Sequence, residues 1–593
     1  MWDPQQPHGG PCRAGAIAKA ATKRGYSDNV MSAVIAVCRL KDCAMECRQS
    51  TLIPAPSPQP RGIQALSPTP RVRKWAYKLA LLFCFIWLLA FVIQPTMFSH
   101  PLGFLATLLP AAVHAAVDRD WYAPANTDVN NITAAFNSDG VYGFIFNTSE
   151  TPAGEYGTYN WCNMPHARKT EYVKPSDEYS LKYVEVIHRH HKRTPYADNA
   201  FPVEPYHWDC DDQGLYYYGQ RLPAGSGKGA SAHGYWDGFN SSINPFVPSG
   251  WIGSCQFPQI TADGLDDSWT HGADLYGVYH DLLGFLPDKV EDWGNKIRYR
   301  VTNNQITSQV AGMLLAGMWG ASSHDIPLLV QASSIDSLEP AYTCTAGSDL
   351  FDSIKSSSNP AWADHLTRAV DLYAALDAVS GVPASDSGFH TWFDHYYDNL
   401  SARQCHGKPL PCNATTGECI TQEQTNAVYR LGQWEYSQIY RDAKDSLAAS
   451  VSTYGVWIAE LAAHLRAVVN GESEVIYWHN IAHDGSVSRL LSILQIEQMV
   501  WPGMGSEVVF EMWGKTGNST TITRRRGARS AAAESESGLY VRVLFSGQPL
   551  RSSNPSLGLL DLLPVETLLG YFDGLVGENA SLVKEKCAGS STS

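Results

Sequence analysis

Lysine and arginine are scarce over most of this chain. Residues 1–78 hold 12 Lys and Arg against 4 Asp and Glu, whereas the remainder holds 32 against 54, a net charge of −22. Nucleic-acid binding depends on cations that neutralise phosphates, so this acidic body argues against a nucleic-acid partner. The basic residues between Thr516 and Gly538 lie in a stretch poor in apolar residues, which we interpret as an exposed loop.

The cysteines lack the spacing of a zinc site. Cys405, Cys412 and Cys419 are each separated by six residues, with no Cys-x-x-Cys pair among them, which argues against a zinc knuckle. Five cysteines lie in residues 1–84 and eight lie after residue 117, an even number that predicts four disulfides and an oxidising compartment. All seven Asn-x-Ser/Thr sequons also follow residue 116, which predicts a glycosylated lumenal or secreted body; they are Asn131, Asn147, Asn240, Asn399, Asn413, Asn518 and Asn579.

The N-terminal region leaves two interpretations open. Residues 1–78 are basic and rich in proline and serine and show no core-forming pattern, so we expect a disordered tail or an artefact of gene prediction. The apolar run 79–93 follows basic residues and could be a signal anchor, although it is shorter than the roughly 20 residues of a typical span. Alternatively, Met97 is the start and a second apolar run, 102–113, is a cleaved signal peptide. Both place the body outside the cytosol.

A cluster of basic residues follows the apolar run 182–188, which is rich in β-branched and aromatic residues and predicts a buried strand. The cluster reads Arg189, His190, His191, Lys192 and Arg193, and Pro195 ends it. Guanidinium groups offer rigid forks of donors that match phosphate oxygens, so the pattern indicates chemistry on an anion. A metal site made by His188, His190 and His191 is the alternative, but two adjacent arginines would repel a cation, and we expect no metal.

A second motif lies about three hundred residues later. Residues 474–482 predict another buried strand, and His483 and Asp484 follow it directly. The residues after this pair have helical spacing, with Ser486 as the predicted N-cap. The pair should therefore lie between the end of a strand and the start of a helix, where an anion is favoured.

These two motifs resemble the R-H-G-x-R-x-P and His-Asp signatures of the histidine acid phosphatases, and residues 255–264 and 540–550 extend the likeness, which is nearest to fungal-type secreted members. The resemblance covers roughly residues 118–587, with 588–593 as a tail. It implies an α/β fold with a mixed, mainly parallel sheet flanked by helices and a smaller helical cap at about 310–445. Strand-like runs at 182–188, 474–480 and 540–545 alternate with helical stretches at 307–319, 361–379 and 451–469, which agrees with this fold.

The resemblance also implies the chemistry. His190 would attack the phosphorus of a phosphomonoester, Asp484 would protonate the leaving oxygen, and no metal or organic cofactor would take part. The phosphoryl oxygens would be held by Arg189, Arg193 and His483.

Two departures from the family pattern leave a second hypothesis open. His191 stands where the family has glycine, and Ile306 stands at the second arginine of the family's R-x-T-x-x-x-R frame, which begins here at Arg300. Loss of one charge-assisted donor would cost about 2–4 kcal/mol of transition-state stabilisation. The alternative is therefore a catalytically impaired member that binds phosphorylated or anionic ligands. The sequence does not indicate the oligomeric state.

Overall fold

The computed structural model describes residues 117–146, 156–204, 207–210, 216–219, 232–235, 239, 241, 243–247, 252–289, 294–320, 326–516 and 535–589. These residues belong to one compact unit, Ala112–Ser593. The expected tail at 1–78, the anchor at 79–93 and the alternative signal peptide lie outside the described residues. Among the helices within the ranges above, none combines the length and apolarity needed to cross a membrane.

A central mixed sheet has the strand order β11-β10-β9-β1-β8-β6-β7, with β12 paired to β10. One half is parallel, because β1 pairs with β8, β8 with β6, and β6 with β7. The other half, from β1 to β9 and onward, is antiparallel. The strands are β1 (Tyr179–Arg189), β6 (Ile297–Val301), β7 (Leu328–Leu329), β8 (Tyr477–Ala482), β9 (Glu507–Lys515), β10 (Leu539–Phe545), β11 (Gln548–Pro549) and β12 (Leu563–Pro564). This arrangement confirms the predicted mixed α/β fold, and the three predicted strands correspond to β1, β8 and β10.

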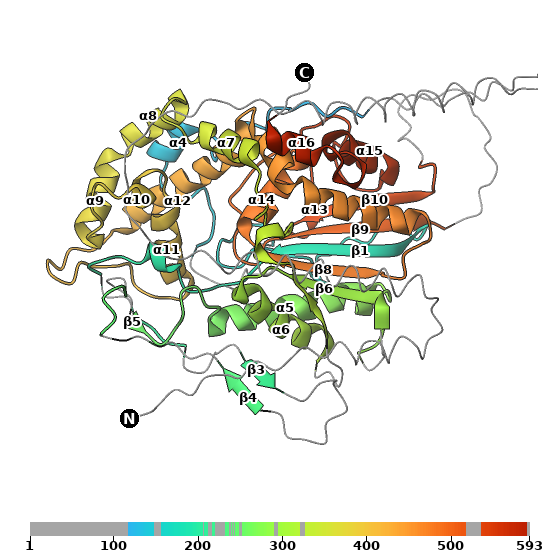
Figure 1. Cartoon of the computed structure of the whole chain (residues 1–593), viewed down its shortest axis with the longest axis horizontal. Coiled ribbons are helices and arrows are strands. Elements are labelled where there is room, and N and C mark those ends of the chain that lie inside the picture. The colour runs from blue at the N-terminus through green and yellow to red at the C-terminus, as the bar shows by residue number, and fades with distance from the viewer. Residues whose placement is uncertain are drawn as a thin grey trace, which may run out of the picture. The chain divides into compact units, whose positions relative to one another are not determined.

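Helices cover both faces of this sheet (Figure 1). On one face, Val184 and Val186 of β1 pack into a core with Leu314 and Met318. This layer consists of α5 (Ala262–Tyr276) and α6 (Gln305–Trp319). On the other face, Ile187 joins a second core, beneath α13 (Ser446–Val469), α14 (Asp484–Ile493) and α15 (Val565–Val576). Alternate side chains of β1 therefore enter two separate cores, as a strand with helices on both faces requires.

A group of helices lies at one end of the sheet (Figure 1). It contains α4 (Ile132–Asn137), α8 (Pro360–Arg368), α9 (Val370–Ser380), α10 (Ser387–His390), α11 (Asp394–Cys405) and α12 (Gln422–Ser437). The helix predicted over 361–379 is in fact two helices, because the chain turns at the buried Ala369. The expected start of the cap, residue 310, falls inside α6, which packs on the sheet. The division into catalytic and cap domains stays a prediction.

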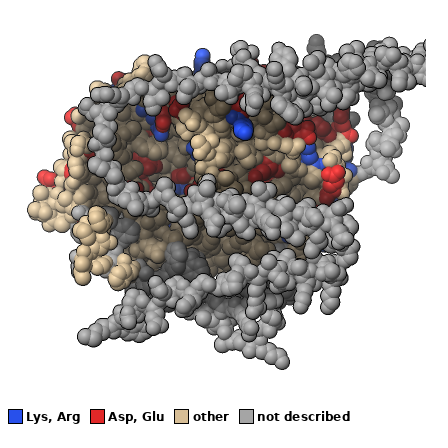
Figure 2. Space-filling view, in the orientation of Figure 1, with Lys and Arg blue, Asp and Glu red and all other residues tan. Residues whose placement is uncertain are grey.

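Shorter elements complete the described chain. The small strands are β2 (His207–Trp208), β3 (Tyr216–Gly219), β4 (Ala232–Tyr235) and β5 (Ile252–Gly253), where β2 pairs with β5 and β3 with β4. The remaining α-helices are α7 (Thr345–Ile354) and α16 (Val583–Ala588), and π-helical turns extend α5 at Gly277–Leu282 and α12 at Gln438–Asp442. On the face drawn in Figure 2, the described acidic and basic side chains are interspersed.

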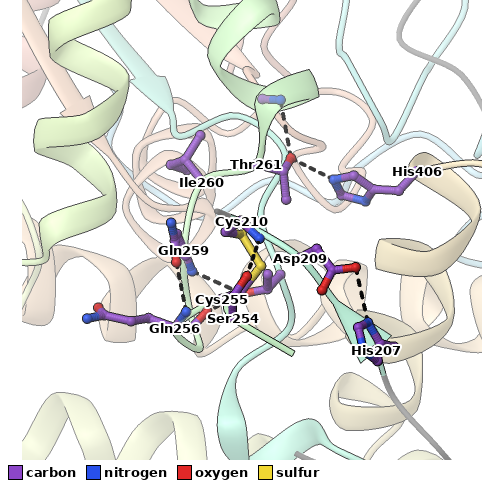
Figure 3. The surroundings of a disulfide bond; sticks show 12 residues. His207, Asp209, Cys210, Ser254, Cys255, Gln256, Gln259, Ile260, Thr261 and His406 are labelled. Atoms are coloured by element: carbon purple, nitrogen blue, oxygen red, sulfur yellow. Dashed lines mark hydrogen bonds and ion pairs between the residues drawn. A yellow bond between two sulfur atoms is a disulfide. The ribbon is translucent and has the colours of Figure 1, made fainter. Parts of the chain in front are cut away.

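Four disulfides join the eight cysteines of the body, as predicted. They are Cys162–Cys405, Cys210–Cys255, Cys344–Cys587 and Cys412–Cys419. The pairing of Cys412 with Cys419 agrees with the exclusion of a zinc knuckle there. Figure 3 shows the Cys210–Cys255 bond beside the segment that leads to Thr261, whose side chain caps α5 by accepting from the Gly264 amide. Within this segment, Ile260 forms an isolated antiparallel bridge with Arg193 of the first motif. The disulfide therefore anchors the segment that pairs with that motif.

Candidate active site

The two sequence motifs meet at the carboxyl ends of β1 and β8. These strands are parallel neighbours and their register pairs Arg189 with Ala482, so the residues that follow both strands emerge side by side. A pocket of about 400 Å³ lies at these strand ends, and its lining includes all five predicted site residues, Arg189, His190, Arg193, His483 and Asp484. The carboxyl edge of a parallel sheet is where such folds place ligands.

His190 is buried and its imidazole has a defined orientation. Its Nδ1 lies 2.9 Å from the carbonyl oxygen of His191. Because a carbonyl only accepts, Nδ1 carries the hydrogen and Nε2 keeps its lone pair. Burial, followed by the positive charges of Arg189 and Arg193, holds the pKa of His190 well below its ordinary value. The imidazole therefore stays neutral in acid, which removes one obstacle to its acting as a nucleophile at low pH.

The Arg189 guanidinium is held from three directions. Its Nη1 donates to the carbonyl of Pro502 at 2.6 Å, and its Nη2 lies 3.2 Å from Oδ2 of Asp484. The indole of Trp161 lies under the guanidinium at 4.6 Å. These contacts fix the plane of the group within the pocket.

Arg193 is also held by two contacts, one of them from the helical group. Its Nη1 lies 3.0 Å from Oδ1 of Asp398 on α11, and its guanidinium covers the ring of Tyr196 at 4.3 Å. The Nε atoms of Arg189 and Arg193 are buried and make no hydrogen bond to any of the described residues. Each guanidinium carries five N–H donors and the contacts above use only some of them, so two oriented guanidinium groups are suited to a bound phosphoryl group.

His483 and Asp484 connect β8 to α14. His483 Nε2 lies 2.9 Å from the Thr302 hydroxyl, and burial together with the two arginines lowers its pKa to about 4. Burial alone would raise the pKa of Asp484, but the Arg189 guanidinium and a hydrogen bond from Trp501 Nε1 at 2.9 Å hold it below its usual value. The free pocket therefore contains a neutral His483 and an ionised Asp484 over most of the acid range.

The predicted N-cap at Ser486 is wrong. The helix begins at Asp484, and His483 is its N-cap residue with extended backbone angles. Ser486 lies in the first turn, where its hydroxyl donates to the Leu338 carbonyl at 2.7 Å. The strand runs on to Ala482, so the change of direction occurs at the motif itself and not after it.

Several pocket residues carried little or no signal in the sequence. Arg489 lines the pocket from α14, and it is recognisable only once that helix is known to begin at Asp484. Asp398 and Trp501 support Arg193 and Asp484 from within the pocket lining, and Thr302, the threonine of the R-x-T frame, supports His483 from outside it. They come from elements far apart in the chain, so only the tertiary fold brings them to the site.

Ile306 does not occupy the position that the arginine frame predicted. Its side chain is fully buried on α6, in a core with Ile260, Val301 and Val310, and it does not line the pocket. The Arg300 guanidinium is also directed elsewhere, toward Glu460 at 2.7 Å. The third guanidinium at the pocket is that of Arg489.

His191, the residue at the glycine position, also points away from the pocket. Its Nε2 lies 3.1 Å from Nδ1 of His271 on α5, and Nε2 of His271 lies 3.0 Å from the carboxylate of the buried Glu507. One ring nitrogen from each of His188, His191 and His271 lies within 4.8 Å of the other two, so within the described part of the chain these three residues could hold a metal. It differs from the group weighed in the sequence, because His271 replaces His190. Of the three, only His191 and His271 share a hydrogen bond, whereas Nδ1 of His188 lies 2.8 Å from the Arg189 carbonyl oxygen.

Comparisons with known proteins gave curated relatives of low identity and distant solved structures. No family model matches the chain. "Counting factor 60" of Dictyostelium discoideum is 25% identical over 350 residues, covering 57% of this chain and 77% of that protein. "2-phosphoxylose phosphatase 1" of Danio rerio is 24% identical over 420 residues, covering 66% and 77%. Among solved structures, the apo phytase of Hafnia alvei has a TM-score of 0.42 at 12% identity, covering 69% of this chain and 99% of that one.

The pocket brings together two guanidinium groups, a buried imidazole and a carboxylate, and a curated protein named as a phosphatase is similar to 66% of the chain. This likeness agrees with the resemblance to the histidine acid phosphatases that the two motifs indicate.

Proposed function

We propose that this protein hydrolyses phosphomonoesters at an exported or lumenal location, in two steps through a phosphohistidine at His190. The convergence of both motifs on one pocket is the observation that supports this proposal most strongly. In the first step His190 Nε2 forms a bond to phosphorus while the ester oxygen leaves with a proton from Asp484. In the second step water attacks the phosphohistidine, gives a proton back to Asp484 and releases inorganic phosphate.

The charges of the pocket account for how Asp484 could act as an acid. In the free site Arg189 faces Asp484 and favours its ionised form. A bound phosphate dianion would engage the same guanidinium and would place negative charge beside the carboxylate. Both changes raise the pKa of Asp484, because nearby negative charge disfavours ionisation. Substrate binding would therefore bring the proton that the leaving oxygen requires.

The rival function, an impaired member that binds anions, rested on His191 and Ile306. Neither residue lines the pocket, and Arg489 adds a guanidinium that the motif comparison had not counted. These observations favour the hydrolase. A p-nitrophenyl phosphate assay from pH 3 to 7 tests it, together with trapping of an acid-labile phosphoenzyme. Tight phosphate binding without turnover at any pH in that range would support the rival instead.

The export part of the proposal is supported by the four disulfides, which persist in oxidising compartments. The sequons at Asn399 and Asn413 are buried, and their side-chain amides donate to the carbonyls of Asn199 and Ala378. The folded chain cannot carry glycans at these two positions. Asn131 and Asn579 are exposed and remain acceptable sites.

Glycosidase treatment of protein from its native host tests export. We expect a mobility shift, and we expect the double variant Asn131→Gln with Asn579→Gln to show a smaller one. A variant of the buried pair, Asn399→Gln, should leave the shift unchanged. An absent shift together with free thiols in the body would place the protein in the cytosol.

A further inference from the structure

Three histidine side chains meet between the end of strand β1 and helix α5. One ring nitrogen from each of His188, His191 and His271 lies within 4.8 Å of the other two, and all three side chains are fully buried. None of the three lines the pocket. Buried polar atoms almost always have a partner, so three imidazoles that converge away from solvent call for an explanation beyond packing.

The hydrogen bonds of two of these imidazoles suit them to bind a metal. His188 Nδ1 lies 2.8 Å from the Arg189 carbonyl oxygen, which only accepts, so Nδ1 carries the hydrogen and Nε2 keeps its lone pair. That Nε2 is buried and makes no hydrogen bond to any of the described residues. His271 Nε2 lies 3.0 Å from the Glu507 carboxyl group, and its Nδ1 lies 3.1 Å from His191 Nε2. A carboxylate or a carbonyl on the other ring nitrogen is the usual support of a histidine that binds a metal.

Glu507 supplies negative charge beside this histidine cluster. It is fully buried on β9, and it accepts a hydrogen bond from the Ala167 amide. Burial raises the pKa of this carboxyl group, whereas His166 and the Ala167 amide oppose that shift. A cation bound at Nδ1 of His271 would oppose it further, because nearby positive charge favours an ionised carboxylate. Metal binding would therefore keep the shared hydrogen on Nε2 of His271.

The cations of the first motif, which argue against a metal in the sequence, are compensated in the fold. Each has a carboxylate partner: the pairs are Arg189–Asp484 at 3.2 Å, Lys192–Asp267 at 3.1 Å and Arg193–Asp398 at 3.0 Å. The two arginines also line the pocket, which the three histidines do not. A metal ion in the cluster would thus lie next to the Glu507 carboxylate without an uncompensated arginine to repel it.

We propose that His188, His191 and His271 bind one Zn²⁺ ion, in a structural site that joins the end of β1 to α5. Imidazole nitrogens are ligands that Zn²⁺ prefers. Zinc at about 2.1 Å from each nitrogen would place the ligand nitrogens roughly 3.4 Å apart, so the three rings need to close only slightly. His191 would bind through Nε2 and carry its hydrogen on Nδ1, which is buried without a hydrogen bond to the described residues. The ion would touch no residue of the pocket lining, so this inference does not depend on the proposed function.

The test measures zinc in the full chain, purified without a polyhistidine tag. The protein is unfolded in denaturant with EDTA, with its disulfides intact, and is refolded with or without Zn²⁺. We expect about one zinc per chain after gel filtration of the sample refolded with Zn²⁺, and a Tm about 3 °C or more above that of the zinc-free sample. A chain that retains no zinc after this treatment, or whose Tm is the same in both samples, would overturn the inference.

Variants locate the ion. His188→Gln and His271→Gln should each lower the affinity for Zn²⁺ by about a hundredfold or more and abolish the rise in Tm, because each removes a ligand. Glu507→Gln should weaken binding by about 10–100-fold, since it removes only the support of His271. The matched control is His365→Gln: His365 is equally buried and lies 2.8 Å from the carboxyl group of Glu435, and its loss should leave one zinc per chain.

Two further outcomes decide the site even where a variant folds poorly. Wild type refolded with Co²⁺ in place of Zn²⁺ should show the visible absorption of a cobalt ion bound by nitrogen in a closed site, and a spectrum equal to that of aqueous Co²⁺ would overturn the inference. Folded His188→Gln and His271→Gln proteins that keep the zinc content of wild type would also overturn it, because the ion would then lie elsewhere on the chain.

Discussion

The residues from Arg189 to Arg193 leave strand β1 toward two different environments. Arg189, His190 and Arg193 line the pocket. His191 and Lys192 instead contact side chains of α5, where His191 bonds to His271 and the Lys192 ammonium lies 3.1 Å from the Asp267 carboxylate. All five side chains are buried, so burial does not distinguish the two groups. What distinguishes them is the partner: the pocket group keeps donors and a lone pair for a ligand, whereas His191 Nε2 and Lys192 Nζ contact side chains of α5. Three residues of this motif therefore belong to the site, and the other two attach the strand end to α5.

The largest expected effect comes from comparing alanine variants of the two neighbouring histidines, His190 and His191. We expect His190→Ala to lower kcat on p-nitrophenyl phosphate by about a thousandfold or more and to abolish the phosphoenzyme, because the nucleophile is gone. His191→Ala should keep kcat within about tenfold, and should instead reduce the free energy of unfolding by about 2–4 kcal/mol by leaving a cavity beside His271. Steady-state kinetics and thermal unfolding of both variants measure this. The reverse pattern would show that His191 is the pocket residue.

The acid gives the next largest effect. Asp484→Asn should slow alkyl phosphates by about a hundredfold or more, because their leaving oxygens need a proton. Aryl phosphates should be affected much less, since a stabilised phenolate leaves without protonation. Asp398→Asn is a useful control, as it alters a carboxylate of the same pocket that supports Arg193. Equal losses on both esters for Asp484→Asn would remove the proton donor from the proposed mechanism.

The apolar core behind the pocket gives a third prediction. Ile306→Arg should destabilise the fold by several kcal/mol, because it buries an unpaired guanidinium among Ile260, Val301 and Val310. Thermal unfolding measures the loss, with Ile306→Val as a control that should cost about 1 kcal/mol. A stable Ile306→Arg variant with tighter phosphate binding would restore the assignment of this position to the second arginine of the family frame.

The smallest effect concerns pH. Burial lowers the pKa of His483 from 6.5 to about 4 in the folded protein, so between these values the unfolded chain binds more protons at this site. The stability that a neutral His483 contributes is therefore complete above pH 6.5 and is lost as the pH falls toward 4. We expect wild type to lose about 1–3 kcal/mol more than His483→Gln over that window, measured by denaturant unfolding. Parallel pH curves for the two proteins would contradict the shift.

The sequence predicted the site where chemistry and local pattern coincide. Two runs could be recognised as buried strands, and the site residues follow them directly: Arg189, His190 and Arg193 follow the first, and His483 and Asp484 follow the second. Because the two strands are parallel neighbours, these residues come together in the fold. It failed at Ile306 because a residue frame specifies spacing but not which face of α6 turns inward. It could not find Asp398 or Trp501, whose position depends on how a distant helix and a loop pack on the strand ends. The split between α8 and α9 was missed because no breaker residue marks Ala369.

The Cys162–Cys405 disulfide joins the two segments that support the pocket arginines Arg189 and Arg193. Cys162 follows Trp161, which lies under Arg189, and Cys405 ends α11, which carries Asp398, the partner of Arg193. The bond closes a covalent ring with a sequence separation of 243 residues. In the chain-entropy model, a ring of that size restricts the unfolded ensemble by on the order of 5 kcal/mol. Reduction of this disulfide by external thiols should therefore loosen the supports of both arginines at once. The affinity for phosphate would then depend on the redox potential of the compartment.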